Sequence, residues 1–247
     1  MPRFFRLPLL AASFLLTCAT GPAFADEASV RKALEAFFAA PVPVVESVTR
    51  IPQGGLYEAV LINGQLFYTD EAVSFIVDGR IIDTKTRRDL TEARLAALSA
   101  IDFKTLPLDQ AIKRVNGSGK RVLATFEDPN CTYCKKLGQE LQKVKDVTIY
   151  TFLVPILTQD SDAKSRNVWC AKDKSAVWLD WIISGKTPAE AKCDATAIDR
   201  NMELAKKLRV SGTPTLFFTD GTRIGGYRDA EDLEQVLKEA AARTGKK

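Results

Sequence analysis

Residues 121–134 read RVLATFEDPNCTYC, and this stretch decides the fold. Its first six residues form an apolar run typical of a buried strand, and the pattern from Cys131 to Lys145 is helical. A second apolar run at Val147–Val154 predicts another strand. The sequence therefore predicts a β-α-β unit in which Cys131 and Cys134 lie where the first strand gives way to the helix.

The spacing of these two cysteines favours redox chemistry. On a helix, residues i and i+3 share one face at a distance that a disulfide can span. At the first turn, Cys131 faces unpaired backbone N–H groups and the positive end of the helix dipole, which favour a thiolate. A thiol with an ordinary pKa near 8.5 is about 3% ionised at pH 7, whereas a pKa of ~6 makes it about 90% ionised. We therefore expect Cys131 to be the exposed, attacking thiol and Cys134 to be the resolving thiol.

Two other interpretations of the pair are open. Cys-x-x-Cys is also half of a zinc site, but tetrahedral zinc needs two more ligands. The remaining candidates are Cys170 and Cys193, because the chain has no histidine. A structural disulfide between Cys131 and Cys134 would close a loop too small to constrain the unfolded chain much. We expect no metal and no cofactor beyond the cysteines, and the lack of histidine excludes His-based catalysis.

The first 25 residues have the pattern of an export signal. Arg3 and Arg6 precede an apolar run at residues 7–16, and residues 23–25 read Ala-Phe-Ala, a small-x-small cleavage site. The apolar run is shorter than the ~20 residues that span a bilayer, so we expect cleavage after Ala25. A buried N-terminal helix and a lipoprotein acylated at Cys18 are the alternatives.

Removal of this signal changes both the charge and the cysteine count. Of 35 basic residues, 33 remain against 31 acidic ones, and a net charge of +2 is too small to indicate a nucleic acid or anionic membrane as partner. Four cysteines remain, an even number that implies pairing and allows three connectivities. A bond between Cys170 and Cys193 would close about 24 residues and stabilise the fold by ~3.4 kcal/mol. We favour a structural role for these two.

The N-terminal part of the mature chain has the signals of a small α+β module. A predicted helix over residues 27–40 has one apolar stripe, formed by Val30, Ala33, Leu34, Phe37 and Phe38. Short β-like runs follow at 44–51, 56–62, 65–69, 72–77 and 80–83, with hairpin signals at residues 63–64 and 78–79. We predict a module at 26–85, a linker helix at 86–105 and a second domain at 106–247. Because so small a module is marginal alone, pairing of an edge strand with a second copy would stabilise it.

The C-terminal part predicts helices around a closing hairpin. Residues 162–209 are helical in pattern with an interruption at Gly185–Pro188, and a last helix is expected at 229–243. Thr213-Pro214 precedes a predicted strand at 215–219, and its position favours a cis bond, to which X-Pro has access. The turn at residues 220–221 then leads into the second strand of a hairpin, at 222–227.

Three stretches resemble the DsbC-type periplasmic thiol:disulfide isomerases, thioredoxin-fold proteins with DsbG as the sister group. They are FEDPNCTYC at 126–134, VWCAKDK at 168–174 and VSGTP at 210–214 with DGT at 220–222. The middle stretch is the most specific, because generic thioredoxins lack it. With the signal, the small module and the linker helix, the resemblance covers nearly the whole chain.

The resemblance implies an α+β fold with a cystatin-like N-terminal dimerisation module, a linker helix and a C-terminal thioredoxin-fold domain with a helical insertion. It implies a V-shaped periplasmic homodimer with a chaperone-like apolar cleft. The partners would be unfolded or misoxidised exported proteins and a membrane reductase of the DsbD type. It implies a Cys170–Cys193 disulfide, Cys131 as nucleophile and Cys134 as resolving thiol. The substrate-binding residues would be Thr132, Tyr133, Thr213 and Pro214, with the Thr213-Pro214 bond cis.

On this hypothesis the protein isomerises or reduces wrong disulfides in exported proteins. One departure is Thr132-Tyr133 between the cysteines, where the family's isomerases usually have Gly-Tyr, a dipeptide that tunes potential and thiol pKa. The rival hypotheses are a dithiol oxidase of the DsbA type and a chaperone with incidental cysteines. Glu127 lies in register with the active-site turn, where it is either a proton relay for Cys134 or an exposed or salt-bridged acid.

Overall fold

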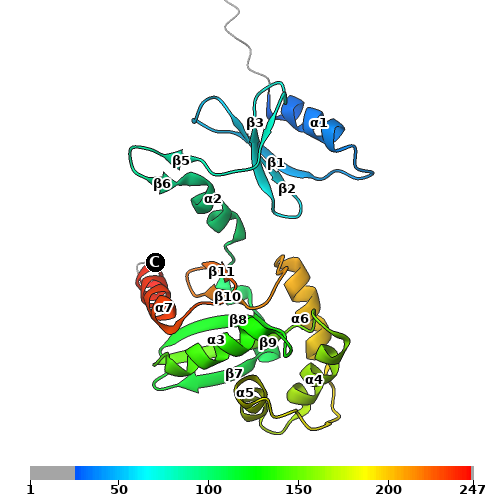
Figure 1. The fold of residues 1–247 in the computed structure, drawn as a ribbon, viewed down its shortest axis with the longest axis vertical. Helices are drawn as coiled ribbons and strands as arrows, with labels where there is room; N and C mark the ends of the chain where they lie inside the picture. The colour runs from blue at the N-terminus through cyan, green and yellow to red at the C-terminus, as the bar shows by residue number, and fades with distance from the viewer. Residues whose placement is uncertain (1–25, 246–247) are drawn as a thin grey trace, which may run out of the picture. The chain divides into compact units, whose positions relative to one another are not determined.

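We describe residues 26–245 from a computed structural model, shown in Figure 1. The expected signal peptide, its cleavage site after Ala25 and Cys18 lie outside these residues. The described chain forms two compact units: residues 26–62 and 66–78 lie in the first, and residues 63–65 and 79–245 in the second. Over residues 26–245, no helix has the length and apolar character needed to cross a membrane.

The first unit packs one helix against a four-stranded antiparallel sheet. Helix α1 (Glu27–Phe38) begins after Asp26, whose carboxylate accepts a hydrogen bond from the Ser29 N–H at 2.8 Å. The strands, in the order β1-β2-β3-β4, are β1 (Val45–Arg50), β2 (Tyr57–Leu61), β3 (Leu66–Thr69) and β4 (Ile76–Val77). Val30 and Leu34 of the predicted stripe are fully buried against this sheet, but Phe37 is 64% exposed, so its place in the stripe is wrong.

Local side-chain hydrogen bonds shorten two predicted elements. Asp70 accepts from the Ser74 N–H at 2.7 Å and from its hydroxyl at 2.5 Å, which closes a turn where the sequence predicted strand, so β4 starts only at Ile76. After Gly79, β5 (Ile82–Asp83) and β6 (Arg88–Asp89) form a hairpin. Helix α2 (Leu90–Ser99) follows, capped by the Asp89 carboxylate on the Glu92 N–H at 2.7 Å, so it begins later than the predicted linker helix.

The second unit is built on a five-stranded sheet in the order β11-β10-β8-β9-β7 (Figure 1). Strands β8 (Arg121–Glu127) and β9 (Val147–Leu153) are parallel and are connected by α3 (Thr132–Lys143), which confirms the predicted β-α-β unit. The other pairs are antiparallel. The remaining strands are β7 (Ile112–Asn116), β10 (Thr215–Phe218) and β11 (Arg223–Gly225), and two short 3-10 helices, η1 (Phe103–Thr105) and η2 (Leu108–Gln110), precede β7.

The sheet has an apolar core on each face because strand side chains alternate. On one face, Leu123 and Ile149 pack with apolar residues of α3 and α7 (Ala230–Thr244). On the other, Phe126 stacks on Phe152 with ring centroids 4.8 Å apart, over α6 (Thr196–Lys207) and η1. Strand β8 is therefore packed on both faces, and the cysteine pair follows directly after this buried strand.

Three helices between β9 and β10 form a helical insertion, which we define as residues 159–207: α4 (Gln159–Cys170), α5 (Lys174–Ser184) and α6. The sequence predicted one interruption, at Gly185–Pro188, and the structure extends it to Ala195. A second break at residues 171–173 was not predicted. There, the Asp173 carboxylate accepts from the Ala176 N–H at 2.9 Å and starts a new helix.

Candidate active site

Cys131 and Cys134 are both free thiols at the first turn of α3. Cys131 is the N-cap residue, and the Cys134 N–H donates to its sulfur at 3.1 Å. One of the helix N–H groups that lack an intrahelical partner is therefore satisfied by the thiol itself. The pair faces the insertion, since both cysteines belong to one apolar cluster with Trp178 and Trp181 of α5.

Cys131 is less exposed than the sequence predicted. Its exposed fraction is 4% and that of Cys134 is 0%, so the expectation of an open attacking thiol is wrong for this conformation. The cause is the loop before β10: the Cys131 thiol donates to the Thr213 carbonyl oxygen at 3.3 Å, across 82 residues of sequence. The predicted order of exposure is still observed, because Cys134 is more deeply buried than Cys131.

The two thiols have opposite pKa shifts. Hydrogen bonding from the Cys134 thiol is the main cause that lowers the pKa of Cys131, to about 6. Burial opposes this shift, while the Thr213 hydroxyl and the N–H groups of Cys134 and Tyr133 add to it. Burial, followed by hydrogen bonding to Cys131, raises the pKa of Cys134. At neutral pH, Cys131 is the sulfur that carries the charge.

The loop before β10 lies directly beside this thiol. The Thr213-Pro214 peptide bond is cis, and Pro214 is buried. The Thr213 Oγ1 is buried and, while Cys131 is a thiol, has no hydrogen-bond partner in residues 26–245. Its hydroxyl proton is therefore available to the sulfur once Cys131 ionises and can no longer donate. Of the other residues predicted to bind substrate, Thr132 is exposed and Tyr133 is 58% exposed.

Glu127 is a buried acid at the end of β8, four residues before Cys131. It is 2% exposed, accepts from the Thr125 hydroxyl at 2.7 Å, and its Oε2 has no partner in the described residues. Burial raises its pKa to about 7, against hydrogen bonding from Thr125 and the charge of Arg114. An exposed acid was one alternative at this position, and the burial of Glu127 shows that it is wrong. Its charge in turn raises the pKa of Cys134.

The other two cysteines form a disulfide. Cys170 ends α4 and Cys193 lies in the segment before α6, and their Cα atoms are 5.4 Å apart. The zinc interpretation required these two sulfurs as ligands, but here they are bonded to each other. Among residues 26–245, no cluster of three or more acidic or cysteine side chains is arranged to hold a metal ion.

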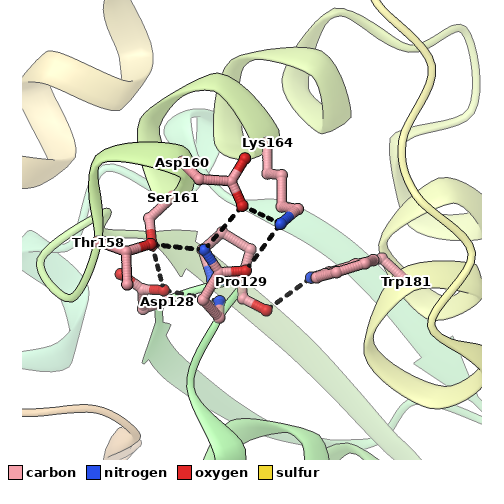
Figure 2. A network of polar contacts seen from close by, with 8 residues as sticks. Asp128, Pro129, Thr158, Asp160, Ser161, Lys164 and Trp181 are labelled. Carbon is pink, nitrogen blue, oxygen red and sulfur yellow. Dashed lines mark hydrogen bonds and ion pairs between the residues drawn. The ribbon is translucent and has the colours of Figure 1, made fainter.

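The role of the polar residues that precede Cys131 was not predicted from the sequence. Asp128 bonds to Ser161 of α4, and Trp181 of α5 bonds to Pro129, as Figure 2 shows. Asn130 bonds to Ser161 and Lys164 of α4. A local signal was present, because Asp-Pro-Asn is a typical turn sequence. Its partners lie between 28 and 52 residues further along the chain and carry no comparable signal.

A Cys-x-x-Cys pair that caps a helix, beside a cis-proline loop and on a sheet with a parallel β-α-β unit, defines a thioredoxin-fold thiol–disulfide oxidoreductase. Two family models match the chain: the thioredoxin-like domain over residues 108–241 and the disulfide bond isomerase protein N-terminal domain over residues 21–92. The chain belongs to the DsbC family of thiol:disulfide interchange proteins, and the predicted resemblance and fold class are confirmed.

Named relatives agree with this assignment. The probable thiol:disulfide interchange protein DsbC of Bordetella pertussis is 47% identical over 193 residues, which are 78% of this chain and 68% of that protein. The thiol:disulfide interchange protein DsbC of Escherichia coli K12 is 27% identical over 91% of this chain and 93% of its own. A crystal structure of a disulfide interchange protein from Neisseria gonorrhoeae is 38% identical, with a TM-score of 0.53 over 55% of this chain and 98% of that one.

Proposed function

We propose that this enzyme rearranges wrong disulfides in exported proteins, with Cys131 as the attacking sulfur and Cys134 as the resolving one. The observation that carries the assignment is the split between the two thiols: Cys131 caps α3 with a pKa lowered to about 6, while burial raises the pKa of Cys134. A low pKa makes Cys131 both a nucleophile at neutral pH and a good leaving group when its mixed disulfide is broken.

The exchange of disulfides can end in two ways. The Cys131 thiolate attacks one sulfur of a substrate disulfide, a mixed disulfide forms, and the other substrate sulfur leaves as a thiolate. If a substrate thiolate then attacks the mixed disulfide, Cys131 is released and no net oxidation has occurred, which is isomerisation. If Cys134 attacks instead, two electrons pass to the substrate and the enzyme is left with a Cys131–Cys134 disulfide, which is reduction.

Substrate would bind at the rim of this site. Tyr133 is exposed between the two cysteines, and Thr132 lies beside it. The backbone of Thr213 and Pro214 lies next to the attacking sulfur, as the 3.3 Å contact with the Thr213 carbonyl indicates. We assign these four residues to substrate binding, and we assign Cys170 and Cys193 to stability.

The setting we propose is the periplasm, after removal of residues 1–25. A module at 26–85 would join two copies and residues 86–105 would connect it to the catalytic domain at 106–247. Strand β4 is an edge of the first sheet and offers unpaired backbone groups to a second copy. Dimerisation would create a cleft that holds unfolded chains, and a membrane reductase of the DsbD type would return Cys131 and Cys134 to thiols.

The test is refolding of scrambled ribonuclease by wild type, Cys131→Ala and Cys134→Ala. Cys131→Ala should fall to the rate without enzyme, because no mixed disulfide forms. Cys134→Ala should keep part of the isomerase activity and lose the reduction of disulfides, since only the resolving step is removed. Equal ribonuclease yields for wild type and Cys131→Ala would overturn the proposal.

A further inference from the structure

The three residues before Cys131 are held by the helical insertion and by the loop at residues 156–158 that leads into it. We call Asp128, Pro129 and Asn130 the lead-in segment. It joins the end of β8 to the start of α3, and each of its residues bonds to side chains or backbone between residues 156 and 181 (Figure 2). The Cys131 N–H donates to the Asp128 carbonyl oxygen at 3.1 Å, so the position of the cysteine follows that of the segment.

Asp128 anchors the segment at its first residue. Its side chain is fully buried, and its Oδ2 accepts from the N–H groups of Ile156 and Leu157 at 2.8 and 2.9 Å. Its Oδ1 accepts from the Asn130 N–H at 2.7 Å and from the Ser161 hydroxyl at 2.8 Å. A buried carboxylate that accepts four hydrogen bonds is well satisfied, and it fixes the segment to the start of α4.

Asn130 connects this anchor to a cation. Its Oδ1 accepts from Lys164 Nζ at 3.0 Å, and its Nδ2 donates to the Ser161 Oγ at 3.1 Å and to the Thr158 Oγ1 at 2.7 Å. Lys164 is an ion-pair partner of Asp160, and its side chain is 15% exposed. A lysine ammonium can only donate, so it fixes which end of the Asn130 amide faces it.

The hydrogen bonds therefore run in one direction. Lys164 donates to Asn130, Asn130 donates to Ser161, and Ser161 gives its single hydroxyl proton to Asp128. A cation stands at one end of the chain and a buried carboxylate at the other, which orients the two neutral groups between them. Removing Lys164 leaves the Asn130 Oδ1 without this donor, so one side of the amide is no longer held, while its Nδ2 still faces Thr158, Asp160 and Ser161.

A second contact with the insertion holds the middle residue. The Trp181 indole N–H donates to the Pro129 carbonyl oxygen at 2.6 Å. Lys164 Nζ lies 4.4 Å from the centroid of the Trp181 ring, within cation–π range, so the lysine contacts both Asn130 and the tryptophan that holds Pro129. Lys135, in the first turn of α3, lies 4.5 Å from the same ring.

We propose that Asn130 and Lys164 are positioning residues that keep Cys131 at the N-cap of α3, where the Cys134 and Tyr133 N–H groups favour its thiolate. The inference rests on the proposed role of Cys131 as the attacking sulfur. When the lead-in segment loosens, Cys131 leaves the N-cap position for part of the time, its bonds from those N–H groups weaken, and its pKa rises towards that of an ordinary thiol. The helical insertion thus acts on the reactivity of a cysteine that it does not contain.

The test is the pH dependence of Cys131 alkylation by iodoacetamide in the reduced full-length protein. The variants are Lys164→Met, Lys164→Arg and Asn130→Ala, each with its thermal midpoint recorded. Lys143→Met is the matched control, because Lys143 pairs with Glu140 on the surface of α3 just as Lys164 pairs with Asp160, but does not touch the lead-in segment.

At pH 5, Lys164→Met and Asn130→Ala should react three- to tenfold more slowly than wild type, which is roughly the change that half to one pKa unit produces. Lys164→Arg keeps a donor and a cation, so its alkylation rate should stay within about twofold of the wild-type rate. Lys143→Met should react at the wild-type rate.

Two outcomes overturn the proposal, and they separate it from the proposed function. If wild type titrates near pH 6 and both Lys164→Met and Asn130→Ala follow the same profile, the positioning role is wrong while the role of Cys131 stands. If wild type itself titrates like a free cysteine, the role of Cys131 fails and the positioning role fails with it. Asn130→Ala may be replaced by Asn130→Asp if it does not fold, since the aspartate keeps the acceptor for Lys164 but cannot donate to Ser161.

Discussion

The backbone N–H of Cys134 lies 3.1 Å from the sulfur of Cys131 and points at it, so the two active-site cysteines are connected before any disulfide joins them. The same residue lowers the pKa of Cys131 through its thiol and its N–H, while its own thiol is kept neutral by burial. One cysteine is thus prepared to attack, and the other is held as a thiol until Cys131 forms a mixed disulfide.

Thr213→Val should raise the pKa of Cys131. The valine keeps the shape of the threonine but removes the hydroxyl that favours the thiolate. We expect roughly a three- to tenfold smaller thiolate fraction at pH 5, followed by the ultraviolet absorbance of the thiolate. Thr213→Ser, which keeps the hydroxyl, is the control, and an unchanged titration in the valine variant would contradict the assignment.

Glu127→Gln should change how stability depends on pH. The folded-state pKa of Glu127 is about 7 against an ordinary 4.5, so between these values the folded protein binds more protons than the unfolded chain. Its contribution to the free energy of unfolding is full below pH 4.5 and is lost as pH rises to about 7, by about 3 kcal/mol in the limit.

The measurement is urea unfolding of wild type and Glu127→Gln at several pH values between 4.5 and 7.5. Cys131 contributes to the free energy of unfolding with the opposite sign, because its lowered pKa stabilises the reduced protein as pH rises from about 6 towards 9. Both proteins contain Cys131, so its contribution is subtracted when the free energies of unfolding of wild type and variant are compared at each pH. The variant should gain on wild type by roughly 1 kcal/mol per pH unit across this range. A difference that does not vary with pH would show that Glu127 is not titrating while buried.

Replacement of Cys170 and Cys193 by alanine together should destabilise the oxidised protein. The bond closes a loop across a sequence separation of 23 residues, which corresponds to about 3 kcal/mol in the chain-entropy model. Urea unfolding without reductant measures the loss. In the presence of strong reductant, wild type should fall to the level of the double variant, and a gap that persists there would mean that side-chain packing rather than the bond carries the effect.

The sequence predicts this fold well where the signals are local. The strand before Cys131, the helix it starts, the parallel strand at 147–153 and the hairpin that follows Pro214 each have a clear pattern over a few residues. Strand β7 was missed because Ile112–Asn116 reads IKRVN, an edge strand with only Ile112 fully buried, and so lacks an apolar run.

The sequence predicted the cysteine pair at the helix start, but not the distant residues that contact it. The Cys131–Cys134 spacing and the position at a helix start are local signals, and the structure places both cysteines at the first turn of α3 as they predict. The burial of Cys131 depends on Thr213, and the lead-in segment depends on Lys164, 34 residues after Asn130. Contacts over such separations leave no periodicity in the sequence, so only the folded chain reveals them.

The most direct test of the account is where a substrate becomes attached. Cys134→Ala protein, reduced and mixed with a disulfide-containing peptide at pH 7, should accumulate a mixed disulfide, because the resolving thiol is absent. Mass spectrometry of the digested adduct should place the peptide on Cys131 in nearly every molecule. No adduct, or a peptide attached at Cys170 or Cys193, would contradict the assignment of Cys131 as the attacking sulfur.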